Sequence, residues 1–438
     1  MMTGLAAVSD TSLVERCKGR HPIQPNTIEE TGLNILFLVE LITKILFVSG
    51  QLRLIELVNQ SKLSIGVLEP LIAFMRTERL CEVSRSSDTE TSIAYNLTEL
   101  GRLRAEDYLR KSQYSGPAPV GLQVYTEQVH KQSIVDMKVT HATLAQAFAE
   151  LTVKPAILKQ FGAAMNSGCA IFIYGPPGSG KTFIAEHLIG LLSGEVSIPY
   201  AIAVDNEVIQ IFDPKVHEPI LGCDEGVFLE RRFLADKQWV VCKRPVIKTG
   251  GELSLSILDL DFDESCRFYQ APPQLKANNG LLIIDDLGRQ LTAAKEIMNC
   301  WIVPLDRHVD YLALHSGKKL MLPFDLIVVF STNMPPSELA DEAFLRRLGY
   351  KIYVGSITEA EYREIARQVC KEIGIPYSGT GINYLLFELH YKKGKPLLAC
   401  IPHDILRQVK DHAVYEGVSP QMSEALIDWA WNNYYTHD

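Results

Sequence analysis

The sequence has 438 residues, of which 47% are hydrophobic and 22% charged; this is the length of about three domains and the composition of a soluble globular protein. The formal net charge of −9 excludes an overall basic field that would attract nucleic acid or an acidic membrane, and leaves room only for a local basic patch. Nine cysteines without a CxxC pair favour reduced thiols in the cytoplasm over a disulfide framework.

The N-terminal region begins with a polar segment, residues 1–30, that has no hydrophobic periodicity, and we expect a flexible arm there. It lacks the basic and apolar regions of a signal peptide, and we expect none. The most apolar stretch, residues 35–48, carries Glu40 and Lys44 and is shorter than the roughly 20 residues of a membrane-spanning helix. We therefore interpret it as a core helix and expect no contact with a membrane.

Residues 31–114 follow the order helix, helix, helix, two strands, helix. Pro70 fits the third helix only if it lies in the first turn, where a missing N–H costs little. This order resembles a winged helix-turn-helix domain with residues 68–79 in the recognition-helix position. The expected helices are 35–48, 52–59, 68–79 and 99–111, and the expected strands 81–85 and 93–97.

The charge of this N-terminal domain leaves its partner open. Residues 31–112 contain ten Lys and Arg and ten Asp and Glu, and a neutral domain makes few of the phosphate contacts that give most DNA affinity. Winged domains also bind proteins. The sequence therefore allows either DNA binding through residues 31–114 or protein docking and self-assembly.

Beyond a Pro-rich linker at 115–134, the pattern changes twice. A helix is expected over 144–165, and residues 166–355 then alternate strands with helices, which indicates a parallel sheet with crossover helices. From residue 358 onward the pattern is helical. The expected C-terminal helices are 359–373, 382–392, 402–415 and 419–434.

Residues 175–182 form a complete P-loop motif, GPPGSGKT, between an apolar strand at 169–174 and an expected helix at 182–192. Glycines allow backbone N–H groups to turn inward around phosphates, where side chains would clash. Lys181 is expected to bridge the β- and γ-phosphates of ATP, and Thr182 to offer its hydroxyl to Mg²⁺. The expected nucleotide-binding residues of the loop are Gly175, Pro176, Pro177, Gly178, Ser179, Gly180, Lys181 and Thr182.

Two carboxylates follow a second apolar strand, residues 281–284. Asp285 is expected to hold Mg²⁺, and Asp286 to accept a proton from the attacking water as a catalytic base. A third apolar strand, 326–330, ends near Asn333, whose amide could hold that water. Downstream, Arg346 and Arg347 offer guanidinium groups suited to a transferring phosphate, although the pair could also belong to a solvated helix face.

Together these features resemble the AAA+ ATPase superfamily over roughly residues 135–438. The resemblance implies that Asn333 is sensor 1, and that Arg347 or Arg346 is an arginine finger acting on ATP in a neighbouring subunit of a homo-oligomeric ring, usually a hexamer. The implied fold class is α/β: a P-loop AAA+ core with a parallel sheet at 135–355, a helical C-terminal lid at 356–438 and an N-terminal winged-helix domain.

Two positions depart from the family pattern. Asp286 stands where AAA+ proteins have glutamate, which predicts slow or assembly-dependent hydrolysis. His403 stands where a sensor 2 arginine is usual; Arg407, on the same helix face, either takes that role in binding nucleotide or is a surface residue. Between the two nucleotide motifs, Lys243, Arg244 and Lys248 are either substrate contacts of a pore loop or part of a surface excursion.

These residues predict an ATP- and Mg²⁺-dependent ATPase of the cytoplasm that remodels a protein or nucleoprotein client. The alternative is a slowly hydrolysing, nucleotide-gated switch or a DNA-bound regulator acting through the winged-helix domain.

Overall fold

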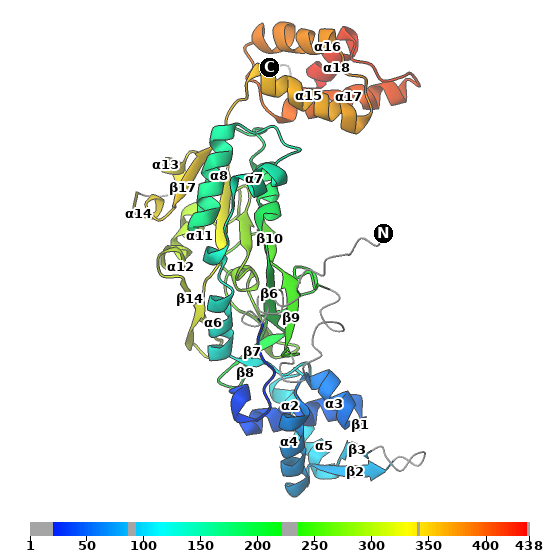
Figure 1. Ribbon diagram of the computed structural model, residues 1–438, viewed down its shortest axis with the longest axis vertical. Helices are drawn as coiled ribbons and strands as arrows, with labels where there is room; N and C mark the ends of the chain where they lie inside the picture. Colours follow the sequence, from blue (N-terminus) through cyan, green and yellow to red (C-terminus); the bar gives the residue numbers. More distant parts are fainter. Residues whose placement is uncertain (1–20, 86–92, 221–234, 340–341, 436–438) are drawn as a thin grey trace, which may run out of the picture.

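The computed structural model describes residues 21–85, 93–220, 235–339 and 342–435. Figure 1 shows an elongated chain with the N-terminal helical domain at one end, the helical C-terminal region at the other, and sheets between them. Within the described ranges, no helix combines the length and apolar character that crossing a lipid bilayer requires.

The N-terminal domain packs its helices against a small antiparallel sheet of order β1-β3-β2. Ser64 caps α4 by accepting a hydrogen bond from the Val67 N–H, so this helix begins before the expected residue 68. Pro70 consequently lies inside α4 rather than in its first turn. The elements are α2 (Ile35–Ser49), β1 (Leu52–Arg53), α3 (Leu54–Ser61), α4 (Ile65–Thr77), β2 (Cys81–Arg85), β3 (Ile93–Leu97) and α5 (Glu99–Lys111).

Residues 21–30 do not form the expected flexible arm, because they are hydrogen-bonded to distant parts of the chain. The Asp236 N–H donates to the Pro22 carbonyl (3.0 Å), and the Ser64 hydroxyl donates to the Pro25 carbonyl (2.6 Å). The 3-10 helix η1 (Glu29–Thr31) begins within this segment. Residues 1–20, and residues 86–92 between the two expected strands, lie outside the described residues.

A second sheet, of order β11-β12-β8-β7-β4, lies between the N-terminal domain and the P-loop core. Its hydrophobic cluster includes Val120, Tyr125 and Val129, so most of the expected linker at 115–134 is folded rather than extended. The elements are β4 (Val120–Gly121), α6 (Leu122–Lys131), β7 (Ala201–Val204), β8 (Glu207–Gln210), β11 (Asp261–Asp263) and β12 (Phe268–Gln270). Two antiparallel two-stranded sheets accompany them, β6 (Glu195–Pro199) with β9 (Trp239–Lys243) and β14 (Val309–Ala313) with β15 (Lys319–Pro323).

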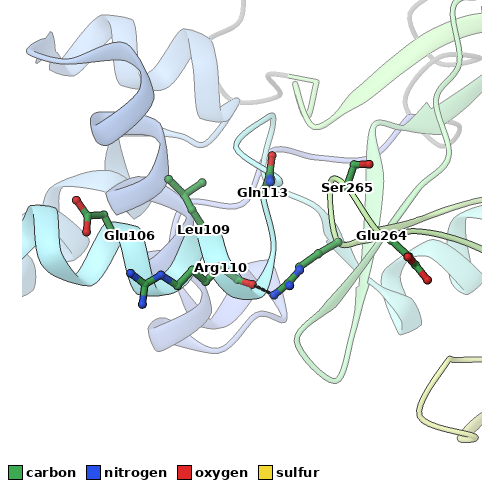
Figure 2. A pocket seen from close by; sticks show the side chains of 7 residues that line it. Glu106, Leu109, Arg110, Gln113, Glu264 and Ser265 are labelled. Atoms are coloured by element: carbon green, nitrogen blue, oxygen red, sulfur yellow. Dashed lines mark hydrogen bonds between the residues drawn. The ribbon is translucent and has the colours of Figure 1, made fainter.

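The junction between the N-terminal domain and this second sheet is hollowed. The Gln113 N–H donates to the Cys266 carbonyl (2.9 Å), and the Arg267 guanidinium donates to the Arg110 carbonyl, as the dashed line in Figure 2 shows. Beside these bonds lies an open cavity of about 530 Å³. Its lining consists of Glu106, Leu109, Arg110, Gln113, Glu264, Ser265 and Arg267, which lie on or just after α5 and between β11 and β12.

The P-loop core is a five-stranded sheet of order β10-β13-β16-β5-β17 with every neighbouring pair parallel. Side chains alternate between two hydrophobic clusters: Ile171 and Ile173 face one, and Phe172 faces the other. The α/β fold class predicted from the alternating pattern is confirmed. The strands are β5 (Ile171–Tyr174), β10 (Val246–Thr249), β13 (Leu281–Ile284), β16 (Ile327–Thr332) and β17 (Tyr350–Tyr353).

Short helices cover both faces of this sheet. The single helix expected at 144–165 is two helices, because Pro155 starts a new one and proline cannot supply an interior N–H. The elements are η2 (Ile134–Asp136), α7 (His141–Ala147), α8 (Pro155–Ser167), α9 (Lys181–His187), η3 (Leu188–Leu191), α10 (Pro273–Lys276), α11 (Ala294–Cys300), α12 (Ile302–Arg307), α13 (Pro336–Leu339) and α14 (Glu342–Leu345).

The C-terminal region is helical, as expected, and has its own hydrophobic cluster around Tyr362 and Trp431. Its last helix starts at Glu424, where Ser423 accepts the capping hydrogen bond, rather than near residue 419. The elements are α15 (Glu359–Ile373), α16 (Gly379–Tyr384), the π-helix η4 (Leu385–Tyr391), α17 (Cys400–Tyr415) and α18 (Glu424–Tyr434).

Candidate functional site

The P-loop connects the buried strand β5 to helix α9. Gly175, Gly178 and Gly180 all have positive φ angles, of 151°, 77° and 92°, which a side chain disfavours. A Cβ atom on Gly175 would lie 2.0 Å from the Val354 carbonyl oxygen. Glycine is therefore required here both by backbone conformation and by the close approach of the chain after β17.

Lys181 is held inside this loop. Its Nζ donates to the carbonyls of Gly175 (3.0 Å) and Pro176 (2.9 Å) and to Asn333 Oδ1 (2.7 Å). Burial lowers the pKa of Lys181, while the nearby Asp286 and Asp285 carboxylates act to raise it. The ammonium group is thus desolvated and positioned among groups that a phosphate could replace as partners.

Thr182 and Asp285 meet at the end of β13. Thr182 Oγ1 donates to Asp285 Oδ1 (3.1 Å), and the same oxygen accepts the Asp286 N–H (3.0 Å). A hydroxyl beside a carboxylate fits Mg²⁺, which usually takes one or two protein oxygens and completes its shell with water and substrate phosphates. Thr182 and Asp285 would hold the ion, and the ion would neutralise charge on the phosphates.

Asp286 differs from its neighbour in conformation and exposure. Its φ is +51°, in the left-handed region that aspartate tolerates better than most residues. The carboxylate is 50% exposed and lies 3.9 Å from Arg289. It is therefore open to water at the same edge of the sheet as Lys181.

Asn333 directly follows β16, which lies between β5 and β13 in the sheet. Its contact with Lys181 joins the third apolar strand to the P-loop. The carboxyl ends of these three parallel strands thus bring Lys181, Asp285 and Asn333 to one edge.

The two arginines after α14 each lie near a carboxylate of the same chain. Arg346 is 82% exposed and lies 3.8 Å from Glu342. Arg347 is 31% exposed and lies 3.9 Å from Asp306, which is in the last turn of α12.

Helix α17 begins directly against the P-loop. The Cys400 N–H donates to the Gly178 carbonyl (3.1 Å), and a Cβ on Gly178 would lie 2.4 Å from Cys400 Sγ. His403, one turn into the helix, is half-buried beside Asp404 (3.3 Å). Arg407 is exposed one turn farther from the loop.

The three basic residues considered for a pore loop lie instead on and beside strands β9 and β10. Lys243 pairs with Glu218 (2.6 Å). Arg244 donates to the carbonyls of Asn279 (2.6 Å), Ser193 (2.9 Å) and Gln132 (3.1 Å), so it joins the two sheets.

Lys248 belongs to the nucleotide site, which the sequence analysis missed. Its Nζ lies 2.6 Å from Glu186 Oε1 and 3.6 Å from Asp285 Oδ2. The hydrogen bond with Glu186 raises the pKa of Lys248, and the charge of Asp285 adds to this. Only strand order could reveal this neighbour, because β10 pairs with β13.

Gln290 was also missed. Its amide donates to the carbonyls of Gly250 (3.2 Å) and Asp285 (3.3 Å) and accepts from the Gly288 N–H (2.8 Å). It thereby links the turn after Asp286 to the end of β10.

The sheet order decides the fold type. The strand before Asn333 separates the P-loop strand from the strand before Asp285, and the side chains at their tips are in contact. The core is a P-loop α/β fold built on a parallel five-stranded sheet.

Comparisons with known proteins add the following findings. A family described as a domain of unknown function (DUF8689) matches residues 358–433. No curated protein matches the sequence. Among solved structures, NtrX from Brucella abortus in complex with ADP is similar at 13% identity and a TM-score of 0.38, over 65% of this chain and 56% of that chain.

The Holliday junction branch migration motor RuvB from Thermotoga maritima is similar at 12% identity and a TM-score of 0.36, over 64% of this chain and 69% of that chain.

Proposed function

We propose that this chain binds ATP with Mg²⁺ and hydrolyses it as an AAA+ ATPase. The observation that carries the proposal is the convergence of Lys181, Thr182, Asp285 and Asn333, from three parallel strands, through contacts of 2.7 and 3.1 Å. An ammonium, a hydroxyl, a carboxylate and an amide at one sheet edge are the groups that phosphoryl transfer to water requires.

Each group has a role that follows from its chemistry. Lys181 exchanges its backbone acceptors for phosphate oxygens, and Thr182 with Asp285 holds the metal. Asp286, exposed to water, accepts the proton of the attacking water. Asn333 orients that water, because its amide already lies at the Lys181 ammonium.

Assembly supplies the remaining positive charge. We propose that Arg347, with Arg346 as the alternative, acts on ATP bound by a neighbouring subunit of a ring, most simply a hexamer. Both arginines lie beyond α14, and the carboxylates near them are Asp306 on α12 and Glu342 on α14. Neither Asp286 nor Arg347 would then suffice alone, and turnover would depend on protein concentration.

The N-terminal domain, which we propose to be winged-helix-like, is better suited to a protein client than to DNA. The exposed face of α4 carries Ile65, Glu69, Ala73 and Arg76, a mixture with no basic stripe for phosphates. The proposed work of the ATPase is therefore remodelling of a protein or nucleoprotein client.

The test compares ATP turnover and nucleotide binding of the wild type with Lys181→Ala and Asp286→Asn. We expect Lys181→Ala to abolish both activities, and Asp286→Asn to bind ATP but hydrolyse it at least about a hundredfold more slowly. Equal turnover in all three proteins would refute an ATPase at this site.

A nucleotide-gated switch is the second candidate, favoured by Asp286 and His403 at the two positions where the family pattern has glutamate and arginine. The hydrogen bond between Cys400 and Gly178 would couple the lid to the P-loop in either case. ATP-dependent assembly with negligible turnover at saturating protein concentration would support the switch. Salt-sensitive retention of residues 31–114 on duplex DNA would support a DNA-bound regulator.

A further inference from the structure

An ion pair between Lys248 and Glu186 lies beside Asp285, next to the position proposed for the metal. Lys248, near the end of β10, lies between Glu186 on α9 (2.6 Å) and Asp285 Oδ2 (3.6 Å). Asp285 Oδ1 is meanwhile directed to Thr182 Oγ1 and to the Asp286 N–H. One carboxylate oxygen thus faces the proposed metal position and the other faces a fixed ammonium.

Helix and strand geometry place this ion pair beside the site. Glu186 is four residues after Thr182 on α9, so both side chains lie on the same face of the helix. Lys248 is opposite Ile283 in the parallel pairing of β10 with β13, two residues before Asp285. Glu186, Lys248 and Asp285 therefore form a row of alternating charge: negative, positive, negative.

We infer that Lys248 and Glu186 set the affinity of the site for Mg²⁺, with Lys248 weakening it and Glu186 strengthening it. This inference rests on the proposed Mg²⁺–nucleotide binding. A fixed ammonium beside Asp285 repels a divalent cation and partly neutralises its ligand, whereas Glu186 holds Lys248 by the shorter contact and returns one negative charge to the region. Both are positioning residues and neither is a metal ligand.

Changes of Mg²⁺ affinity in opposite directions for the two variants distinguish this electrostatic role from a structural one. Lys248→Met and Glu186→Gln break the same 2.6 Å ion pair, so lost packing or stability would move both variants in the same direction. An electrostatic role moves them in opposite directions. Lys248→Arg keeps the charge and should behave as the wild type.

The experiment measures the dissociation constant of fluorescent mant-ADP on the full chain, once in EDTA and once in saturating Mg²⁺. The dissociation constant in EDTA divided by that in Mg²⁺ reports the coupling between metal and nucleotide, and this ratio rises when the site binds the metal more tightly. We expect Lys248→Met to raise this ratio on the order of tenfold, because a unit charge about 4 Å from Asp285 in a water-exposed site has that effect on a divalent ion. Glu186→Gln should lower it about threefold, since its charge is farther away.

A matched control comes from a second exposed pair with the same 2.6 Å separation, Lys243 with Glu218, which belongs to β9 and the segment before it. Lys243→Met should leave the ratio unchanged. Shifts of Lys248→Met and Glu186→Gln in the same direction, or no shift in either, would overturn the inference while leaving the proposed function intact. A wild type that binds no mant-ADP in either condition would overturn both.

Discussion

Replacement of Asp286 separates its proposed chemical role from its conformational one. Asparagine tolerates the left-handed backbone at φ +51° as well as aspartate does, and the ion pair that it loses is exposed on both sides, at 65% for Arg289 and 50% for Asp286. Such a pair contributes less than about 1 kcal/mol. Asp286→Asn should therefore unfold within about 1 kcal/mol of the wild type in urea while losing at least about a hundredfold in turnover, the usual contribution of a general base.

Asp286→Ala tests the conformational role of this residue in the left-handed backbone. Alanine in the left-handed region costs about 1 kcal/mol more, so this variant should lose turnover and also unfold at lower urea. Phosphate release at saturating ATP and protein gives the rate, and mant-ATP binding shows whether the site is filled. Turnover of Asp286→Asn within threefold of the wild type, with ATP bound, would refute Asp286 as the catalytic base.

Three further substitutions, two of them with a control variant, test the scaffold. Arg244→Ala removes a guanidinium bonded to three carbonyls and should lower the free energy of unfolding by about 2–4 kcal/mol. Its control, Lys243→Ala, removes one side of an exposed ion pair and should change that free energy by less than about 1 kcal/mol. Equal losses in the two variants would contradict the structural role of Arg244. Gly175→Ala places a Cβ 2.0 Å from a carbonyl oxygen and should cost about 3 kcal/mol and nucleotide binding, whereas Gly251→Ala, with open space around it, should be nearly neutral. Burial raises the pKa of Asp236 from 3.8 to about 6, so between these pH values the folded state binds a proton that the unfolded state has lost. The free energy of unfolding therefore falls as the pH rises from about 4 to 6, and Asp236→Asn should raise it by about 1–3 kcal/mol at pH 7. Urea unfolding at pH 4.5 and 7 would check this.

Local patterns were sufficient where one segment determines its own structure. The run 281–284 is apolar at every position and forms the buried strand β13. Residues 359–373 have the capping pair Thr358 and Glu361 and form α15 with the expected bounds. The P-loop motif likewise lies between β5 and α9, because its glycines can adopt the positive φ angles that the tight turn there requires.

Other local predictions failed where a distant segment supplied the partner. Residues 21–30 looked disordered because their hydrogen-bonding partners, Ser64 and Asp236, are not adjacent in sequence. Residues 115–134 looked like a linker because β4 is short and is stabilised by pairing with β7. The composition of a segment does not show its tertiary contacts, and these two segments are ordered by contacts with distant parts of the chain.

The sequence by itself therefore determined the chemistry of the site: which residues form the P-loop, which carboxylates end the apolar strand, and that Asn333 follows another strand. Only the tertiary structure decided which other charges share that site. The order of parallel strands places β10 beside β13, which puts Lys248 at Asp285 and turns Arg244 toward backbone carbonyls. Strand order depends on long-range packing of both sheet faces, and no spacing along the chain encodes it.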